Sequence, residues 1–222
     1  MRKSFHEQLA EAERLVVETT GTVLRQIDGS LESLQTRDKE LADKVIAGDD
    51  DVDACYIEIE QRVLTLLATQ APVASDLRLV SAMLHINIHL ERMADLCTNI
   101  AKFVKLAPQG PFSEDIVREI VEMGRQAGRM LETAIEAFAE RDLDKALTLP
   151  TMDETIDRLN RSLFKKVARQ FIGHEEEIEW GTRMVLVSRQ LERMGDHAVD
   201  IAEQVAFMIT GEFREFTDDD VV

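Results

Sequence analysis

The sequence ERMAD at residues 91–95 returns as ERMGD at residues 192–196. Each stretch places a glutamate and an aspartate four residues apart, which is one turn along the same face of an α-helix. Both carboxylates of a stretch therefore point toward one spot. Because acidic residues abound in this chain, a single pair of this kind carries little information, and the repetition of the whole stretch is the stronger signal.

A second acidic pair precedes each stretch. Asp49 and Asp53 precede ERMAD, and Asp153 and Asp157 precede ERMGD. Suppose that each pair and its stretch lie on the two arms of an antiparallel helical hairpin. Residues that face each other across the hairpin are then equally distant in sequence from its turn, so both facing pairs of acids have the same midpoint. The first midpoint is Pro72, and the second falls within FIGHEE, where a turn is also expected. The sequence therefore predicts that four carboxylates meet at one level of a helix pair, twice in one chain.

The composition is typical of a helical protein. Hydrophobic residues make up 45% of the 222 residues, which is enough for a core, whereas aromatic residues make up only 5%. The ten glycines and four prolines are few for this length, and good helix formers are abundant. We expect an all-α protein.

The formal net charge of −17 narrows the possible partners. Nucleic acids and anionic membrane surfaces attract basic proteins, so an acidic chain of this kind is not expected to bind either. Its charge fits cations or basic partners. There is no apolar run of membrane-spanning length and no signal-peptide core, so we expect a soluble, cytoplasmic protein. The hairpin register separates Cys55 from Cys97 by about 12 Å along the helices, too far for a disulfide.

Apolar periodicity, caps and breakers predict six helices. Arg37-Asp38, near the start of the second helix, recurs as Arg141-Asp142 near the start of the fifth, so the two halves repeat. We predict two tandem antiparallel three-helix bundles, at 1–107 and 113–211, followed by an acidic tail at 212–222. Thr36 and Asp142 are the expected N-caps, Pro72 ends the second helix, and Pro150 kinks the fifth or opens it near its start. The expected helices are residues 4–34, 37–70, 75–106, 113–140, 142–172 and 176–210.

Apolar side chains share the helix face of the acids. Glu91 continues a line of Ile88, Leu84 and Leu77, and similar lines accompany the other acids. We interpret these lines as the interhelical seam, with the acids at its end; a solvated acidic face is the alternative. The other lines are Ile57, Leu64 and Leu67 with Asp53, Val185 and Ile178 with Glu192, and Phe164 and Phe171 with Asp157.

Four carboxylates crowded into a seam repel one another, and a bound cation relieves that repulsion. Sites made of carboxylates alone select hard ions such as Mg²⁺, Mn²⁺, Ca²⁺ or iron. Asn99 and Asp200 lie four residues beyond each stretch and extend the ligand set by one turn. The candidate metal ligands are Asp49, Asp53, Glu91, Asp95, Asn99, Asp153, Asp157, Glu192, Asp196 and Asp200.

The histidines and arginines are weighed separately. His197 adjoins Asp196 but points about 100° away on the helix, so ligation is the less favoured interpretation. The other histidines, His89 included, are expected to be structural or solvated. No E-x-x-H occurs, which argues against the di-iron pattern of ferritin-like oxidases. For Arg92 and Arg193 we favour a salt bridge to the previous turn over a partner contact.

The two stretches and their surroundings resemble a known family. LERMADLCTNIAKFV and LERMGDHAVDIAEQV resemble the paired LERIGDHAxNIAE signatures of the PhoU family of phosphate-signalling regulators, and QAPVASDLRLVSAM resembles the segment before the first signature. The resemblance implies two similar three-helix bundles and multinuclear metal clusters held by E(D)-x-x-x-D motifs. The ions implied are iron, zinc or other divalent ions, manganese and magnesium among them.

The resemblance also implies a role. Members of this family are negative regulators of phosphate uptake that act on the ATPase subunit of the Pst-type ABC transporter and on the PhoR histidine kinase, usually as dimers. The first signature departs from the family: Ala94 replaces glycine, Leu96 replaces histidine, and Lys102 stands where the second half has Glu203. We therefore predict weaker metal loading in the first half.

The sequence thus favours a cytoplasmic, non-enzymatic, metal-binding regulator of phosphate homeostasis that is peripheral to membrane complexes. Two alternatives stay open: a carboxylate-bridged, di-iron-like metal oxidase or storage protein, and a structural helical protein whose acids are fortuitous.

Overall fold

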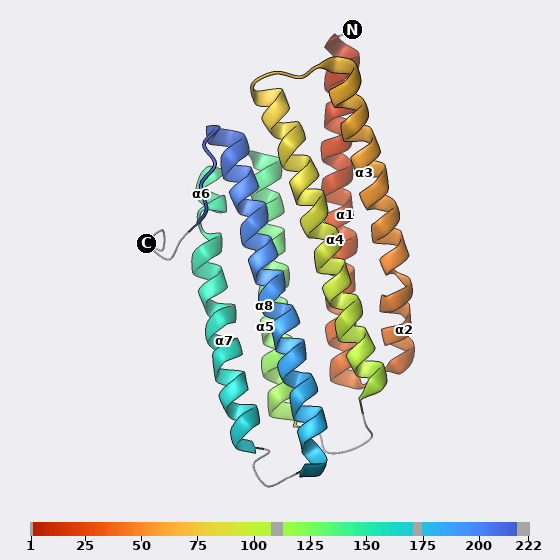
Figure 1. Ribbon diagram of the computed structural model, residues 1–222, viewed down its shortest axis with the longest axis vertical. Coiled ribbons are helices and arrows are strands. Elements are labelled where there is room, and N and C mark those ends of the chain that lie inside the picture. The colour runs from red at the N-terminus through yellow and green to blue at the C-terminus, as the bar shows by residue number, and fades with distance from the viewer. Residues whose placement is uncertain (1, 108–112, 171–174, 217–222) are drawn as a thin grey trace.

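The computed structural model describes residues 2–107, 113–170 and 175–216. Two bundles of long helices stand side by side (Figure 1). Expectations for Phe171, for the turn around His174 and for the end of the tail lie outside the described residues. The elements are α1 (Arg2–Thr36), α2 (Lys39–Ala47), α3 (Asp49–Gln70), α4 (Ser75–Leu106), α5 (Glu114–Glu140), α6 (Leu143–Ala146), α7 (Leu149–Gln170) and α8 (Glu175–Thr210).

The predicted fold class is confirmed, with one refinement. The middle helix of each bundle is not continuous: α2 breaks from α3 at Gly48, and α6 breaks from α7 before Leu149. At Gly48 a Cβ atom would overlap Nε2 of Gln26 on α1, so a larger residue there would require the Gln26 side chain to move. Pro150 is the second residue of α7, a position where its missing N–H costs nothing.

A repeated Arg-Asp pair turns the chain in both bundles. Arg37 and Arg141 both have φ of 58°, the left-handed conformation that ends a helix. The aspartate that follows caps the next helix: Asp38 accepts hydrogen bonds from the N–H groups of Glu40 and Leu41, and Asp142 accepts one from Lys145. Asp142 was the expected cap. Thr36 is not a cap; it is the last residue of α1, and its hydroxyl donates to the carbonyl of Glu32.

The two bundles share one hydrophobic core. α1 packs against α5, and α4 packs against α8, so each bundle supplies two helices to the common interface. On α5 a Cβ atom at Gly124 would overlap Leu31 of α1, and the Arg141 guanidinium forms an ion pair of 2.5 Å with Glu13 of α1. The continuous set of buried residues runs through both halves of the chain.

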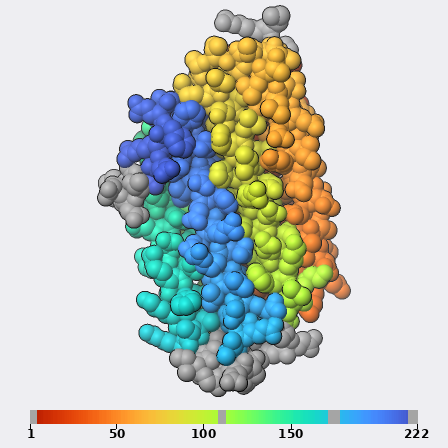
Figure 2. Space-filling model, viewed as in Figure 1, coloured from red at the N-terminus to blue at the C-terminus, as the bar shows by residue number. Residues whose placement is uncertain are grey.

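Helices α3, α4, α8 and α7 form adjacent strips across one face of the molecule (Figure 2). α4 and α8 are the central pair, and they run antiparallel (Figure 1). None of the described helices is both long enough and apolar enough to cross a membrane. Both cysteines are free, as the register predicts, with Cys97 buried.

Candidate metal centre

The first acidic quartet forms where α3 meets α4. Asp49 and Asp53 come from the first two turns of α3, and Glu91 and Asp95 come from α4. The four carboxylates influence one another: the pKa of Asp49 is raised by burial and then by Asp95 and Asp53. The pKa of Glu91 is raised by burial and by Asp95, with contributions from Asp53 and Asp49. The hairpin register predicted this meeting.

The second quartet forms where α7 meets α8 and is more strongly perturbed. Burial, together with repulsion from Asp196, Asp157 and Glu192, raises the pKa of Asp153 to about 7. The pKa of Asp196 is raised by desolvation and then by Glu192 and Asp157. One oxygen of Asp153, Oδ1, is buried and has no hydrogen-bond partner. A buried, unpaired carboxylate oxygen is costly unless a proton or a cation satisfies it.

Gly195 makes the close approach of Asp153 possible. A Cβ atom at this position of α8 would overlap Oδ1 of Asp153 and would lie 3.1 Å from Cδ1 of Ile156. In the first signature the equivalent residue is Ala94, which is itself buried. The glycine in ERMGD therefore lets the acid of α7 lie directly over the backbone of α8, and the alanine in ERMAD does not offer that space.

Most described residues of the apolar lines that accompany the acids are exposed, which corrects the interpretation of these lines as a buried interhelical seam. Ile57, Leu64 and Ile88 are each between 41% and 52% exposed. Phe164 and Ile178 are exposed too. Leu67, Leu84 and Val185 are the exceptions: they are partly buried and pack against the core. The buried side chains lie elsewhere on the same helices, for example Ile59 and Leu66 on α3. The acids therefore lie on a half-exposed face that also carries apolar side chains.

Basic side chains neutralise part of each quartet. Nε of Arg92 lies 3.5 Å from Glu91, and Nη1 lies 3.7 Å from Asp95, so Arg92 pairs with the acids of its own stretch. In the second quartet Arg189 lies 2.5 Å from Glu192, and Arg161 lies 3.2 Å from Asp157. The sequence reasoning missed these last two pairs, although i,i+3 and i,i+4 spacing is the signal that reveals them.

Lys102 puts a positive charge near the first quartet, as the sequence predicts. Its charge acts to lower the pKa of Asp49, but burial and the neighbouring acids outweigh it, so the pKa is raised overall. Asn99 is exposed. Asp200 turns toward two histidines: its Oδ2 lies 3.4 Å from Nδ1 of His89 and 3.5 Å from Nδ1 of His197.

The histidine pair is the part of this face that sequence reasoning undervalued. Nδ1 of His89 and Nδ1 of His197 are 3.2 Å apart, across the contact between α4 and α8. Burial lowers the pKa of His89 to about 4, so its ring is neutral. Among the described residues, His89, His197 and Asp200 form the group whose potential ligand atoms all lie within 4.8 Å of one another. No regularity within one repeat reveals this group, because its members come from both.

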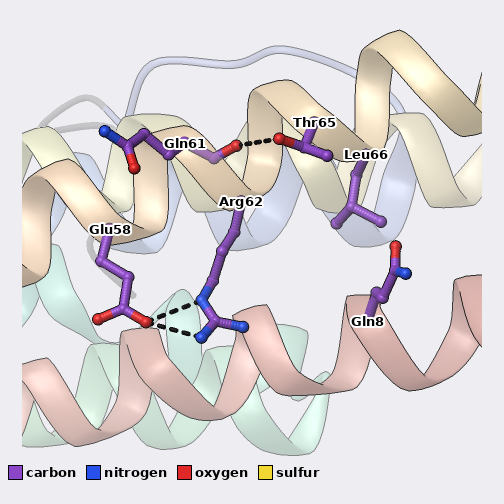
Figure 3. A pocket seen from close by; sticks show the side chains of 6 residues that line it. All are labelled: Gln8, Glu58, Gln61, Arg62, Thr65 and Leu66. Carbon is purple, nitrogen blue, oxygen red and sulfur yellow. Dashed lines mark hydrogen bonds and ion pairs between the residues drawn. The ribbon is translucent and has the colours of Figure 1, made fainter.

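A separate hollow of about 490 Å³ lies between α1 and α3 and is lined by none of the quartet residues (Figure 3). Apart from Leu66 its lining is polar, and its charged side chains pair with one another or with neighbours: Arg62 donates two hydrogen bonds to Glu58 and also lies 3.2 Å from Glu11. The hydroxyl of Thr65 donates to the carbonyl of Gln61. We therefore assign no binding role to this hollow.

Fold and site together define a class: an all-α protein of two similar three-helix bundles, each of which gathers a carboxylate quartet on one face. Comparison with known proteins then gives the family. The PhoU domain matches residues 16–104 and 120–205, one match for each bundle. The chain belongs to the PhoU family.

Relatives and solved structures agree along nearly the whole chain. A phosphate-specific transport system accessory protein PhoU homolog of Caulobacter vibrioides is 32% identical over 210 residues, which cover 95% of this chain and 91% of the relative. The homolog of Zymomonas mobilis is 35% identical, over 94% of this chain and 88% of the relative. The crystal structure of PhoU from Pseudomonas aeruginosa superposes with a TM-score of 0.87 at 29% identity, covering 94% of this chain and all of that one. The phosphate transport system regulatory protein PhoU from Streptococcus pneumoniae gives 0.88 at 29% identity, covering 96% and 100%.

The residues of the quartets suit the ions that the family resemblance implies. Each donor set consists of carboxylates, the ligands that hard cations prefer. Oδ1 of Asp153 is buried against Gly195 and has no hydrogen-bond partner, so it can accept a cation. In the described part of the chain, neither quartet brings three of its oxygens within 4.8 Å of one another. A cation bound by a quartet would therefore have to draw these mutually repelling side chains together.

Proposed function

We propose that this chain is a metal-binding accessory protein of a phosphate-specific transport system, and that it restrains phosphate uptake and phosphate-starvation signalling when phosphate is sufficient. The observation that carries the proposal is the match to the PhoU domain in both halves together with an acidic quartet at the same place in each. Relatives across several bacteria are named as accessory proteins of that transport system. An accessory, non-enzymatic role follows from this proposal.

The face that carries the quartets suits contact with other proteins. It combines acids with exposed apolar side chains such as Leu64, Leu77 and Phe164, and apolar groups beside charges are typical of docking surfaces. We propose that this chain acts in the cytoplasm, as a dimer. Its proposed partners are the ATPase subunit of the transporter and a PhoR-type histidine kinase, so it is peripheral to membrane complexes.

The proposed metals are divalent or trivalent ions bound by the two quartets: iron, zinc, manganese or magnesium. A cation there offsets the burial and the mutual repulsion that raise the pKa of Asp49 and Asp153, and it stiffens the junction of α3 with α4 and of α7 with α8. Metal analysis of the purified protein tests this part. Asp196→Ala is expected to lose more metal than Asp95→Ala, because Lys102 already lies near the first quartet and Gly195 gives the second quartet space that Ala94 does not give the first.

A deletion and complementation experiment tests the regulatory role. The gene is deleted in its host, and phosphate uptake and a phosphate-starvation promoter reporter are measured in phosphate-rich medium. Deletion is expected to raise both, and the wild-type chain is expected to restore repression. A variant with asparagine at Asp153 and Asp157 is expected to restore it only in part. Uptake and reporter activity that do not change on deletion would refute the proposal.

A further inference from the structure

Three potential metal ligands converge at the centre of the face, between the two bundles rather than within either. His89 belongs to α4, and His197 and Asp200 belong to α8. The distance between the two Nδ1 atoms is 3.2 Å, and Oδ2 of Asp200 lies 3.4 Å from Nδ1 of His89 and 3.5 Å from Nδ1 of His197. The three atoms form a nearly equilateral triangle.

The dimensions of this triangle fit a particular ion. Zn²⁺ binds imidazole nitrogen and carboxylate oxygen at about 2.0–2.2 Å in tetrahedral geometry, so two of its ligand atoms lie about 3.3–3.5 Å apart. All three edges lie within about 0.1 Å of that range. Two imidazoles and one carboxylate also form a donor set that zinc accepts, with a fourth position left for water.

The surroundings support a binding site over a simple hydrogen bond between rings. Nε2 of His197 is buried and has no hydrogen-bond partner, so the polar contacts of this ring run through Nδ1 toward the other two ligands. The imidazoles are only 18% and 17% exposed, which fixes their orientation, whereas the Asp200 side chain is 44% exposed and leaves a path for water and ions.

We propose that His89, His197 and Asp200 bind one Zn²⁺ ion, which joins α4 to α8 and thereby links the two bundles. This site is distinct from the carboxylate quartets, because its ligands come from both repeats and include nitrogen. It assigns Asp200 to the histidines rather than to an extension of the second quartet. Zinc bound there ties the two halves together and raises the free energy of unfolding by mass action.

Spectroscopy with cobalt and calorimetry with zinc test the proposal on the whole chain. The protein is stripped of metal and titrated in excess Mg²⁺, which occupies oxygen ligands but competes weakly for imidazole. One equivalent of Co²⁺ is expected to give the intense visible absorption of a tetrahedral complex, and one equivalent of Zn²⁺ is expected to abolish it. Zinc is also expected to raise the thermal midpoint.

Variants separate this site from its neighbours. His89→Gln, His197→Gln and Asp200→Ala are each expected to weaken zinc binding at least tenfold and to remove the cobalt absorption. His85→Gln is the matched control: His85 lies one turn earlier on α4, and its Nδ1 contacts the carbonyl of Ser81 at 2.8 Å, so zinc binding is expected to persist. Circular dichroism checks that each variant is folded.

Two results would overturn the proposal. One is a tetrahedral cobalt spectrum and zinc affinity that survive in both His89→Gln and His197→Gln; the other is an equal loss in His85→Gln. The carboxylate quartets do not share ligands with this site, so Asp49→Asn and Asp153→Asn are expected to leave the cobalt spectrum unchanged. Loss of the spectrum in those two variants alone would assign the ion to the quartets.

Discussion

Gly195 controls how closely Asp153 approaches α8, because a Cβ atom there would overlap the carboxylate. In Gly195→Ala the flexible aspartate has to turn away, so we expect the second quartet to lose most of its metal while the protein stays folded. A helix-interior alanine gains about 1 kcal/mol over glycine, which offsets part of the steric cost. Metal analysis and thermal unfolding of the variant measure both effects.

Gly21 supplies the control for that substitution. It lies inside α1, where an added Cβ atom would meet only the Arg25 side chain, at 3.7 Å. Gly21→Ala should therefore stabilise the protein by up to about 1 kcal/mol and leave the metal content unchanged. Full metal retention in Gly195→Ala would show that the close approach of Asp153 is not needed for binding.

Asp153 makes the stability of the metal-free protein depend on pH. Its pKa rises from the ordinary 3.8 to about 7 on folding, so the folded state binds the proton more tightly than the unfolded state. This stabilisation is present at pH 4 and is lost as the pH rises through about 7. Asp153→Asn removes the charge, and at pH 8 we expect it to be more stable than the wild type by about 1–2 kcal/mol, after allowance for solvent screening.

Urea unfolding at pH 5 and pH 8, with chelator present, measures that difference. Asp50→Asn is the control, because Asp50 is an exposed residue in the first turn of α3. If Asp153→Asn is no more stable than the wild type at pH 8, the carboxylate is not under the strain that its burial implies.

At the scale of helices, the sequence predicted where helices begin and end better than it predicted which of their faces are buried. Caps and breakers such as Asp142, Pro72 and Pro150 act locally, so their positions could be read directly. The break at Gly48 was not predicted, because the apolar periodicity continues from α2 into α3. Several apolar positions share the face of the acids, and periodicity alone could not show that this face is open to solvent.

Two leucines on α3 test the corrected face assignment. Leu64 is 52% exposed and Leu66 is 2% exposed, although they lie two residues apart. Leu66→Ala is expected to lower the free energy of unfolding by about 2–5 kcal/mol, because it leaves a cavity in the core. Leu64→Ala is expected to change it by no more than about 0.5 kcal/mol. Chemical denaturation of both variants decides the point, and equal losses would contradict the face assignment.

At the scale of the whole molecule, the repeat predicted two bundles but not how they meet. No motif in the sequence indicates that α1 packs on α5 or that α4 packs on α8, since these contacts join residues far apart in the chain. For the same reason the sequence did not predict that His89 and His197 lie together. The four acids of each quartet were predictable because both hairpins obey one register.

The shared core predicts that both halves unfold together. Trp180 reports on the second half, because it lies in α8, whereas far-ultraviolet circular dichroism reports on all helices. We expect one transition with coincident midpoints. Leu31→Ala, which removes a contact between α1 and α5, should lower both midpoints equally. A first-half transition separate from that of Trp180 would contradict a single core.

The most direct measurement is anomalous scattering from crystals of the full chain grown with Mn²⁺. If the two acidic quartets are cation sites, anomalous peaks should lie within bonding distance of the carboxylates at the α3–α4 junction and at the α7–α8 junction, with the second peak the stronger. Crystals that bind Mn²⁺ elsewhere and show no peak at either quartet would contradict that claim.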